Sequence, residues 1–120
     1  MLPVIARRLK EARIQAGVSQ KTLGIIVGID EFSASARVNH YERGRHTPDY
    51  QLLEKIAQAL DVPTEYFYAK EDETAELLLV YFDLSQTQKK KMLSQMKKLV
   101  GKGRRRRAKK VSLADNTPTG

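Results

Sequence analysis

The sequence predicts an all-α protein, with five helices within residues 1–68, a helical extension over residues 69–100 and a basic tail over residues 101–120. Three observations lead to this fold class. Apolar residues recur at steps of three and four along several segments, no segment alternates apolar and polar residues as a strand does, and glycines or prolines separate the segments. At 120 residues, 41% of them hydrophobic, the chain can build one small core but has little left for a second.

The first three helices are each bounded by residues suited to begin or end a helix. We expect the first helix over residues 3–16, because Gly17 can take the left-handed conformation that commonly follows a helix. Ser19 is a good N-cap for a short second helix that ends at Gly28. The third helix is expected over residues 33–43.

The fourth and fifth helices follow Pro48. Asp49 is the expected N-cap of the fourth helix, whose wide apolar stripe ends at Leu60. Residues 64–67 are expected to form one further turn, with its aromatic rings packed back on the core.

The extension is predicted to form a helical hairpin. Its first half contains the apolar run of residues 77–82, and Ser85 caps a second helix with apolar residues at helical spacing and lysines around them. From Gly101 onward the chain carries like charges without an apolar period, which predicts a disordered basic tail.

Charge and composition limit the classes of function. Residues 1–68 hold 9 Lys/Arg against 8 Asp/Glu, whereas residues 69–120 hold 13 against 6, and such a basic end suggests a polyanionic partner. The chain has no cysteine, and its two histidines lack the carboxylate or histidine neighbours of a metal site. No catalytic constellation and no membrane span is present, so we expect a cytoplasmic protein that is not an enzyme and has no cofactor.

Residues 19–48 read as two short helices joined by a tight corner. Gly24 lies in the middle of the second helix, where glycine costs about 1 kcal/mol relative to alanine. We interpret it as the small residue that lets this helix cross the third helix closely.

Residues 5–67 resemble the lambda-repressor-like (Xre/Cro-type) helix-turn-helix DNA-binding family. The residues that carry the resemblance are Arg8–Arg13, Gly17–Gln20, Leu23–Gly24, Gly28–Ile29, Tyr41–Gly44, Pro48, Leu53–Leu60 and Val62–Pro63. The resemblance implies a five-helix domain whose third helix enters the major groove of DNA. It also implies an ion pair between Arg13 and Glu42 that locks the first helix against the end of the third.

The resemblance further implies which residues touch DNA. The candidates for reading bases are Ser35, Ala36, Arg37, Asn39 and His40, and those for contacting the DNA backbone are Gln20, Lys21, Arg43 and Arg45. Gln20 is also expected to buttress the reading side chains. The residue types suit these roles, since asparagine can bind adenine in two places, alanine can meet a thymine methyl group and arginine suits guanine or phosphate.

One spacing departs from the family pattern by four residues. Gly28 and Tyr41 are thirteen residues apart, where family members have about nine. Either residues 30–33 form a longer corner, with Phe32 packed on the core, or the third helix begins one turn earlier. We favour the longer corner, because Ser33 is a good cap and the two carboxylates of the corner would be repelled by phosphates.

The expected function is a sequence-specific transcriptional repressor that binds a palindromic operator in double-stranded DNA as a homodimer and is associated with the nucleoid. Residues 75–100 are the expected dimerisation element, although the apolar run could instead pack on the last helix of its own domain. The alternative function is the antitoxin of a toxin-antitoxin pair that also regulates its own operon, with the apolar run facing the toxin or another effector protein.

Overall fold

The computed structural model describes residues 2–101, and its regular elements are all helices. They are α1 (Val4–Gln15), α2 (Gln20–Ile26), α3 (Ala34–Glu42), α4 (Tyr50–Leu60), the 3-10 helix η1 (Thr64–Tyr68), α5 (Asp72–Phe82) and α6 (Gln86–Val100). This confirms the all-α fold class. The disorder expected from residue 102 onward concerns a segment outside the described residues. The chain divides into two compact units, Met1–Asp83 and Leu84–Gly120, which are considered separately.

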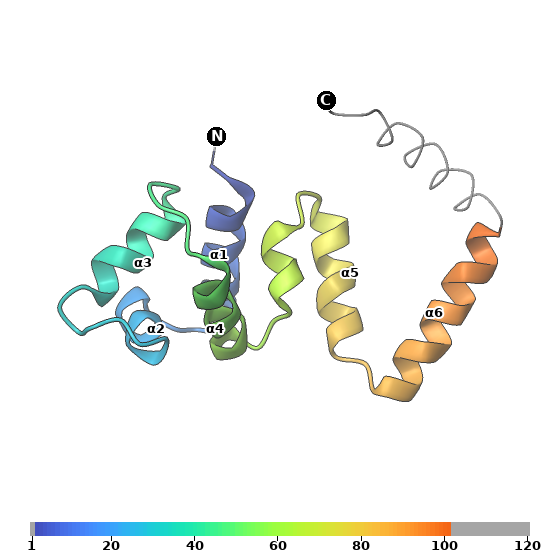
Figure 1. Cartoon of the computed structure of the whole chain (residues 1–120). Helices are drawn as coiled ribbons and strands as arrows, with labels where there is room; N and C mark the ends of the chain where they lie inside the picture. Colours follow the sequence, from blue (N-terminus) through green and yellow to red (C-terminus); the bar gives the residue numbers. More distant parts are fainter. Residues whose placement is uncertain (1, 102–120) are drawn as a thin grey trace, which may run out of the picture. The chain divides into compact units, whose positions relative to one another are not determined.

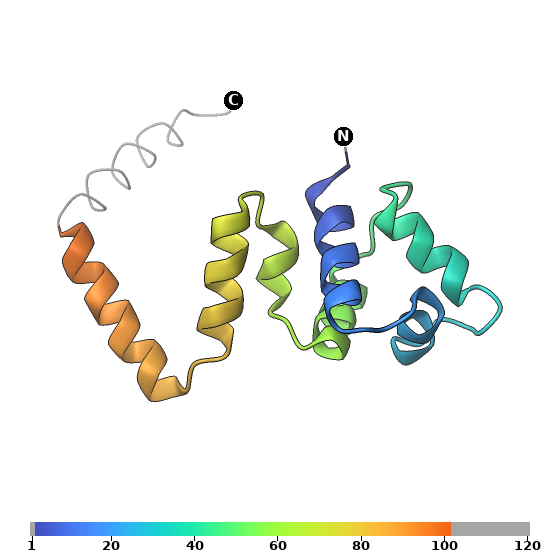
Figure 2. The ribbon, with the colours of Figure 1, turned by 180° about the vertical axis from the view of Figure 1, so that it is seen from behind.

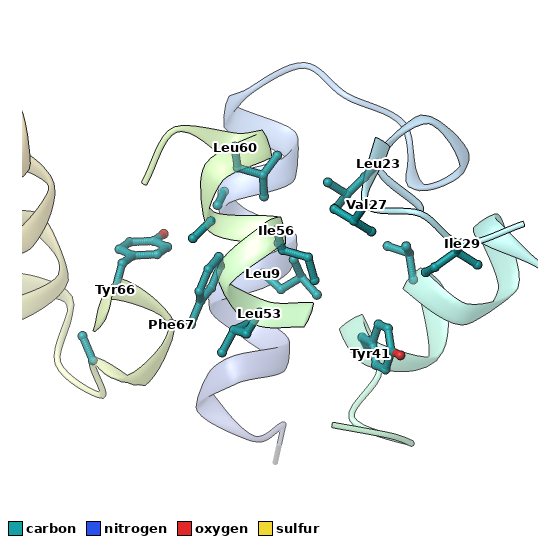
Figure 3. Close-up of a cluster of buried hydrophobic side chains, with 14 of the residues drawn as sticks. Leu9, Leu23, Val27, Ile29, Tyr41, Leu53, Ile56, Leu60, Tyr66 and Phe67 are labelled. Atoms are coloured by element: carbon teal, nitrogen blue, oxygen red, sulfur yellow. The ribbon is translucent and has the colours of Figure 1, made fainter. Parts of the chain in front are cut away.

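The first unit is arranged around α1 and α4. Figures 1 and 2 show α2 beside α3 on one side of this pair, and η1 and α5 on the other. One part of the core consists of Leu9, Leu53, Ile56 and Phe67, each at most 1% exposed, which meet between α1, α4 and η1 (Figure 3). Full burial stabilises each such side chain by about 1.5–3 kcal/mol relative to exposure, so this cluster holds the three elements together.

The predicted caps of α2 and α4 are present. The hydroxyl of Ser19 accepts a hydrogen bond from the backbone N–H of Thr22 at 3.0 Å, and the carboxylate of Asp49 accepts one from Leu52 at 2.8 Å. Each bond satisfies one of the N–H groups that a helix start leaves without an intrahelical partner. These capping interactions therefore define where both helices begin.

The four extra residues lengthen the corner between α2 and α3, as the favoured alternative predicted. Helix α3 begins at Ala34 and keeps nine residues. The expected burial of Phe32 is wrong, since its side chain is 95% exposed. Ile29, 7% exposed, takes the core position of the corner instead, and the Asp30 carboxylate accepts the backbone N–H of Phe32 at 2.8 Å in a tight surface turn.

Ser33 occupies the N-cap position of α3 but makes no capping hydrogen bond. The hydroxyl of Ser33 and the backbone N–H of Phe32 both interact with the Asp30 carboxylate and lower its pKa. The expected capping role of Ser33 is therefore wrong, since its hydroxyl interacts with Asp30 and not with a backbone N–H of α3.

Helix α5 packs on the rest of the first unit along one face only. Ala75 is buried, and Leu78 and Leu79 are partly buried against the core, whereas Leu77 and Val80 on the other side are 50% and 56% exposed. The apolar run is thus divided between an inner and an outer face, and packing within the monomer accounts for the inner face.

Arg8 ties the start of α5 to α1. Its side chain is 3% exposed, and its guanidinium donates to the carbonyl of Ala69 at 2.8 Å and to the carboxylates of Asp72 and Glu11, both at 2.9 Å. Burial lowers the pKa of Arg8, but the hydrogen bonds to the two carboxylates outweigh it and raise the pKa overall.

In the second unit, α6 begins with a capping box in which Ser85 and Gln88 exchange hydrogen bonds of 3.2 and 3.0 Å. None of its residues is buried. The expected pairing of α5 and α6 in a hairpin stays a prediction. No helix among residues 2–101 has both the length and the apolar character needed to cross a bilayer.

Candidate functional site

The crossing of α2 and α3 depends on Gly24. A Cβ atom at this position would lie 2.6 Å from the Cβ of Ala34 and 2.9 Å from its Cα, closer than real Cβ contacts. Only glycine therefore allows this separation of the two helices. The interpretation of Gly24 as the small residue at the crossing is confirmed.

Arg13 and Glu42 join the end of α1 to the end of α3. The guanidinium donates from Nε to Oε2 at 2.5 Å and from Nη2 to Oε1 at 3.0 Å, and the two side chains are 13% and 2% exposed. The hydrogen bond to Glu42 raises the pKa of Arg13 against the opposing effect of burial. Arg13 also donates from Nη1 to the carbonyl of Val18 at 2.9 Å, which fixes the segment that leads into α2.

Gln20 connects α2 to this ion pair and to the middle of α3. Its Nε2 donates to Oε1 of Glu42 at 3.1 Å and to Oδ1 of Asn39 at 3.2 Å. An amide nitrogen carries two N–H donors, so both are used within the protein. The amide oxygen of Asn39 retains a second lone pair for a further partner. The structure thus brings Arg13, Gln20, Asn39 and Glu42 into one network.

The five candidate base-reading residues lie on the outward face of α3. Ser35, Ala36 and Arg37 are exposed, and Asn39 and His40 are half-buried. The inward face consists of Ala34, Val38, Tyr41 and Glu42, all buried. Figure 1 shows that α3 lies at the edge of the first unit, beside α2.

Arg37 lies at the margin of that face. Its Nη2 donates to the hydroxyl of Tyr41 at 2.9 Å, and its guanidinium carbon lies 6.0 Å from the centre of the Tyr41 ring. Each residue of a helix advances about 100°, so Arg37 and Asn39, two residues apart, are about 200° apart in one direction and about 160° apart in the other. The arrangement therefore separates a central group around Ala36 and Asn39 from Arg37.

Exposed cations surround the outward face. Lys21 is exposed on α2, and Arg43 and Arg45 are exposed directly after α3. Sequence reasoning missed His46, whose ring lies 5.4 Å from that of His40 and helps line a hollow beside Arg37. It also missed buried Arg8, although Arg8 falls at helical spacing from the apolar residues Ile5 and Ala12 and could have been found that way.

The described residues contain no group of histidines and carboxylates that could hold a metal ion. The chemistry of the outward face is that of hydrogen bonding and positive charge. An exposed helix face with amide, hydroxyl, methyl and imidazole groups, together with exposed arginines and a lysine on the neighbouring segments, has the composition of a surface that contacts base edges and phosphates.

Comparison with known proteins gives consistent matches. Residues 6–73 match the helix-turn-helix domain family. Over 68 residues the chain is 32% identical to the HTH-type transcriptional regulator ImmR of Bacillus subtilis (strain 168), a match that covers 57% of this chain and 50% of that regulator. The chain thus spans about half the length of this relative. The crystal structure of the transcriptional regulator BswR has 50% sequence identity and a TM-score of 0.75, and the match covers 83% of this chain and 96% of that one.

Proposed function

This chain belongs to the helix-turn-helix family of DNA-binding transcriptional regulators, and from that premise we propose that it represses transcription by binding a two-fold-symmetric operator as a homodimer. Membership of the family confirms the resemblance seen in the sequence. The observation that carries the DNA-binding part of the proposal is the network of Arg13, Gln20, Asn39 and Glu42, which connects α3 to α1 and α2. A fixed wedge of two helices is what docking in the major groove requires.

The central group of the outward face reads bases in this proposal. Asn39 contacts adenine, held in orientation by Gln20, and Ala36 meets a thymine methyl group, with Ser35 and His40 on either side. Each good two-point contact contributes about 1–3 kcal/mol of discrimination against the wrong base.

The surrounding residues set the position of the protein on DNA. Arg37, at the margin beside Tyr41, contacts a phosphate or a flanking guanine. Lys21, Arg43 and Arg45 contact phosphates, which fixes register without selecting sequence. Gln20 acts as a positioning residue, because both of its amide N–H donors are already used within the protein and a phosphate offers only acceptors.

The homodimer is supported by the exposed apolar side chains of the extension. A single helix-turn-helix unit contacts one half-site, and two units joined on half-sites one DNA turn apart bind far more tightly. The exposure of Leu77 and Val80 provides an apolar surface for that association, within residues 75–100.

Selection of bound sequences from random double-stranded DNA tests the proposal. We expect a two-fold-symmetric motif with half-sites about 10 base pairs apart, centre to centre. A motif without symmetry would contradict the homodimer, and the absence of any enriched motif would contradict sequence-specific binding.

The repressor role is tested with a reporter gene whose promoter overlaps the selected motif. Expression of the full chain should lower reporter output, and a variant with Asn39→Ala should lower it less. An increase in output with the full chain would contradict repression.

A further inference from the structure

The outer face of α5 combines an apolar floor with acidic side chains. Glu73, Glu76, Leu77 and Val80 follow the spacing of three and four that places residues in one stripe of a helix, and all four are exposed. With Glu71 and Thr74 they line a shallow hollow. Residues 71–83 contain five Asp/Glu and no Lys/Arg.

Helix α6 has the opposite character. Met92, Leu93, Met96, Leu99 and Val100 form an apolar stripe, each between 40% and 88% exposed. Lys90 and Lys97, seven residues apart and both exposed, border this stripe on the side of Leu93. Residues 86–100 contain five Lys and no Asp/Glu.

We infer that α6 of one chain packs on the outer face of α5 in a second copy of the chain, with its apolar stripe on Leu77 and Val80 and its lysines beside the glutamates of α5. The inference rests on the proposed homodimer and specifies its contact. The two surfaces match in both respects that determine helix pairing, since each offers exposed apolar residues and the charges beside those residues are opposite.

A second copy is the occupant because each chain carries both surfaces and leaves both exposed. Two copies can therefore exchange α6 reciprocally, so that the same contact forms twice about a two-fold axis. That symmetry closes the assembly at two chains and matches the symmetry of the proposed operator.

Reversing the charges on one surface at a time tests this pairing. One variant of the full chain carries Glu73→Lys and Glu76→Lys, and the other carries Lys90→Glu and Lys97→Glu. All four side chains are exposed, so the helices should persist, which circular dichroism verifies. The matched control carries Lys91→Glu and Lys98→Glu. These two residues have the same spacing as Lys90 and Lys97 and undergo the same change of charge, but they lie farther from the apolar stripe of α6.

Molar mass and dimer affinity are measured by light scattering and analytical ultracentrifugation. The unaltered chain and the control should be dimers, and each reversed variant should dimerise at least about tenfold more weakly because like charges then face each other twice. An equimolar mixture of the two reversed variants should restore the dimer as a heterodimer, since each acidic surface again meets a basic one.

Other results would overturn the homodimer, the pairing of α5 with α6, or the exchange between copies. A monomeric unaltered chain overturns the proposed homodimer and this inference with it. A dimeric unaltered chain whose reversed variants remain equally dimeric overturns the pairing alone. Reversed variants that weaken but do not recover on mixing overturn the exchange between copies, and recovery only when all four changes are combined in one chain shows that α5 and α6 pair within one chain.

Discussion

Adding one methyl group at Gly24 tests whether the close contact of α2 and α3 positions the DNA-reading helix. In Gly24→Ala the new Cβ would lie 2.6 Å from the Cβ of Ala34 and 2.9 Å from both its Cα and its carbonyl oxygen. Carbon atoms in van der Waals contact lie about 3.5–4.0 Å apart, so the helices must separate by about 1 Å. Two of the three opposing atoms belong to the backbone and cannot rotate away.

Two opposing effects determine the change in the free energy of unfolding. Overpacking a well-packed contact costs about 1–3 kcal/mol, and the rigid backbone neighbours favour the upper part of that range. Alanine returns about 1 kcal/mol through its higher helix propensity. We therefore expect a net destabilisation of about 1–2 kcal/mol, which lowers Tm by about 5–10 °C in a domain of this size.

Urea and thermal unfolding of the full chain measure the stability, and fluorescence anisotropy with the selected operator measures DNA affinity. We expect Gly24→Ala to bind DNA at least about tenfold more weakly under conditions where it remains folded, because a shift of α3 disturbs several base contacts at once. Thr22→Ala, on the exposed side of α2, is the matched control. It removes the hydrogen bond that the Ser19 hydroxyl donates to Thr22 and gains helix propensity, so we expect unchanged DNA affinity and a stability within about 0.5 kcal/mol of the unaltered chain.

A variant Gly24→Ala with stability and DNA affinity equal to or above those of the unaltered chain would refute this reasoning. Glycine at this position would then have no role in the helix crossing.

Four further changes have expected outcomes. Asn39→Ala should relax base preference within each half-site while the rest of the motif persists, as measured by selection from random DNA; an unchanged motif would contradict its reading role. Glu42→Gln should lower the free energy of unfolding by about 3 kcal/mol in urea titrations, since it leaves a largely buried cation without its charge partner; a loss below about 1 kcal/mol would show that the pair is of little consequence. The hydrogen bonds from Arg8 and Arg7 lower the pKa of Asp72, so this carboxylate stabilises the fold above about pH 4, and that contribution is lost as pH falls further. Asp72→Asn should therefore reduce the dependence of the free energy of unfolding on pH in that acidic range. A pH profile identical to that of the unaltered chain would contradict this linkage. Deleting residues 102–120 should weaken DNA binding and flatten its salt dependence without altering the preferred sequence, and a changed preference would exclude purely non-specific phosphate attraction.

Much of the fold could be predicted because local chemistry determines it. The caps Ser19 and Asp49 satisfy backbone donors within three residues, and helical spacing of apolar residues identifies buried faces. The same locality explains why Gly24 could be interpreted correctly, since a glycine inside a helix needs a packing reason.

The sequence predictions were wrong or incomplete where the partner of a residue lies far along the chain, or where either of two residues could fill one core position. Phe32 and Ile29 are both apolar residues of one corner, and only the tertiary packing shows that Ile29 enters the core. The helical spacing of Arg8 could indicate its buried position, but not its partners Ala69 and Asp72, which lie more than sixty residues further along the chain. No local pattern reports such a contact.

The candidate site was also predicted in part, since its residues could be identified from the sequence but their contacts could not. The resemblance identified the members of the network, but the sequence could not show that Gln20 donates to both Asn39 and Glu42. Nor could it show that Arg37 lies against Tyr41, at the margin of the outward face.

Site-directed cross-linking tests the central claim that the outward face of α3 reads the operator. The natural chain has no cysteine, so Ala36→Cys carries a single attachment point for a photoreactive group at the centre of that face. The account predicts cross-links to bases inside both half-sites of the selected operator, and none from the same group on Gln58→Cys, an exposed position on α4. Equal cross-linking from both positions, or none from position 36, would contradict it.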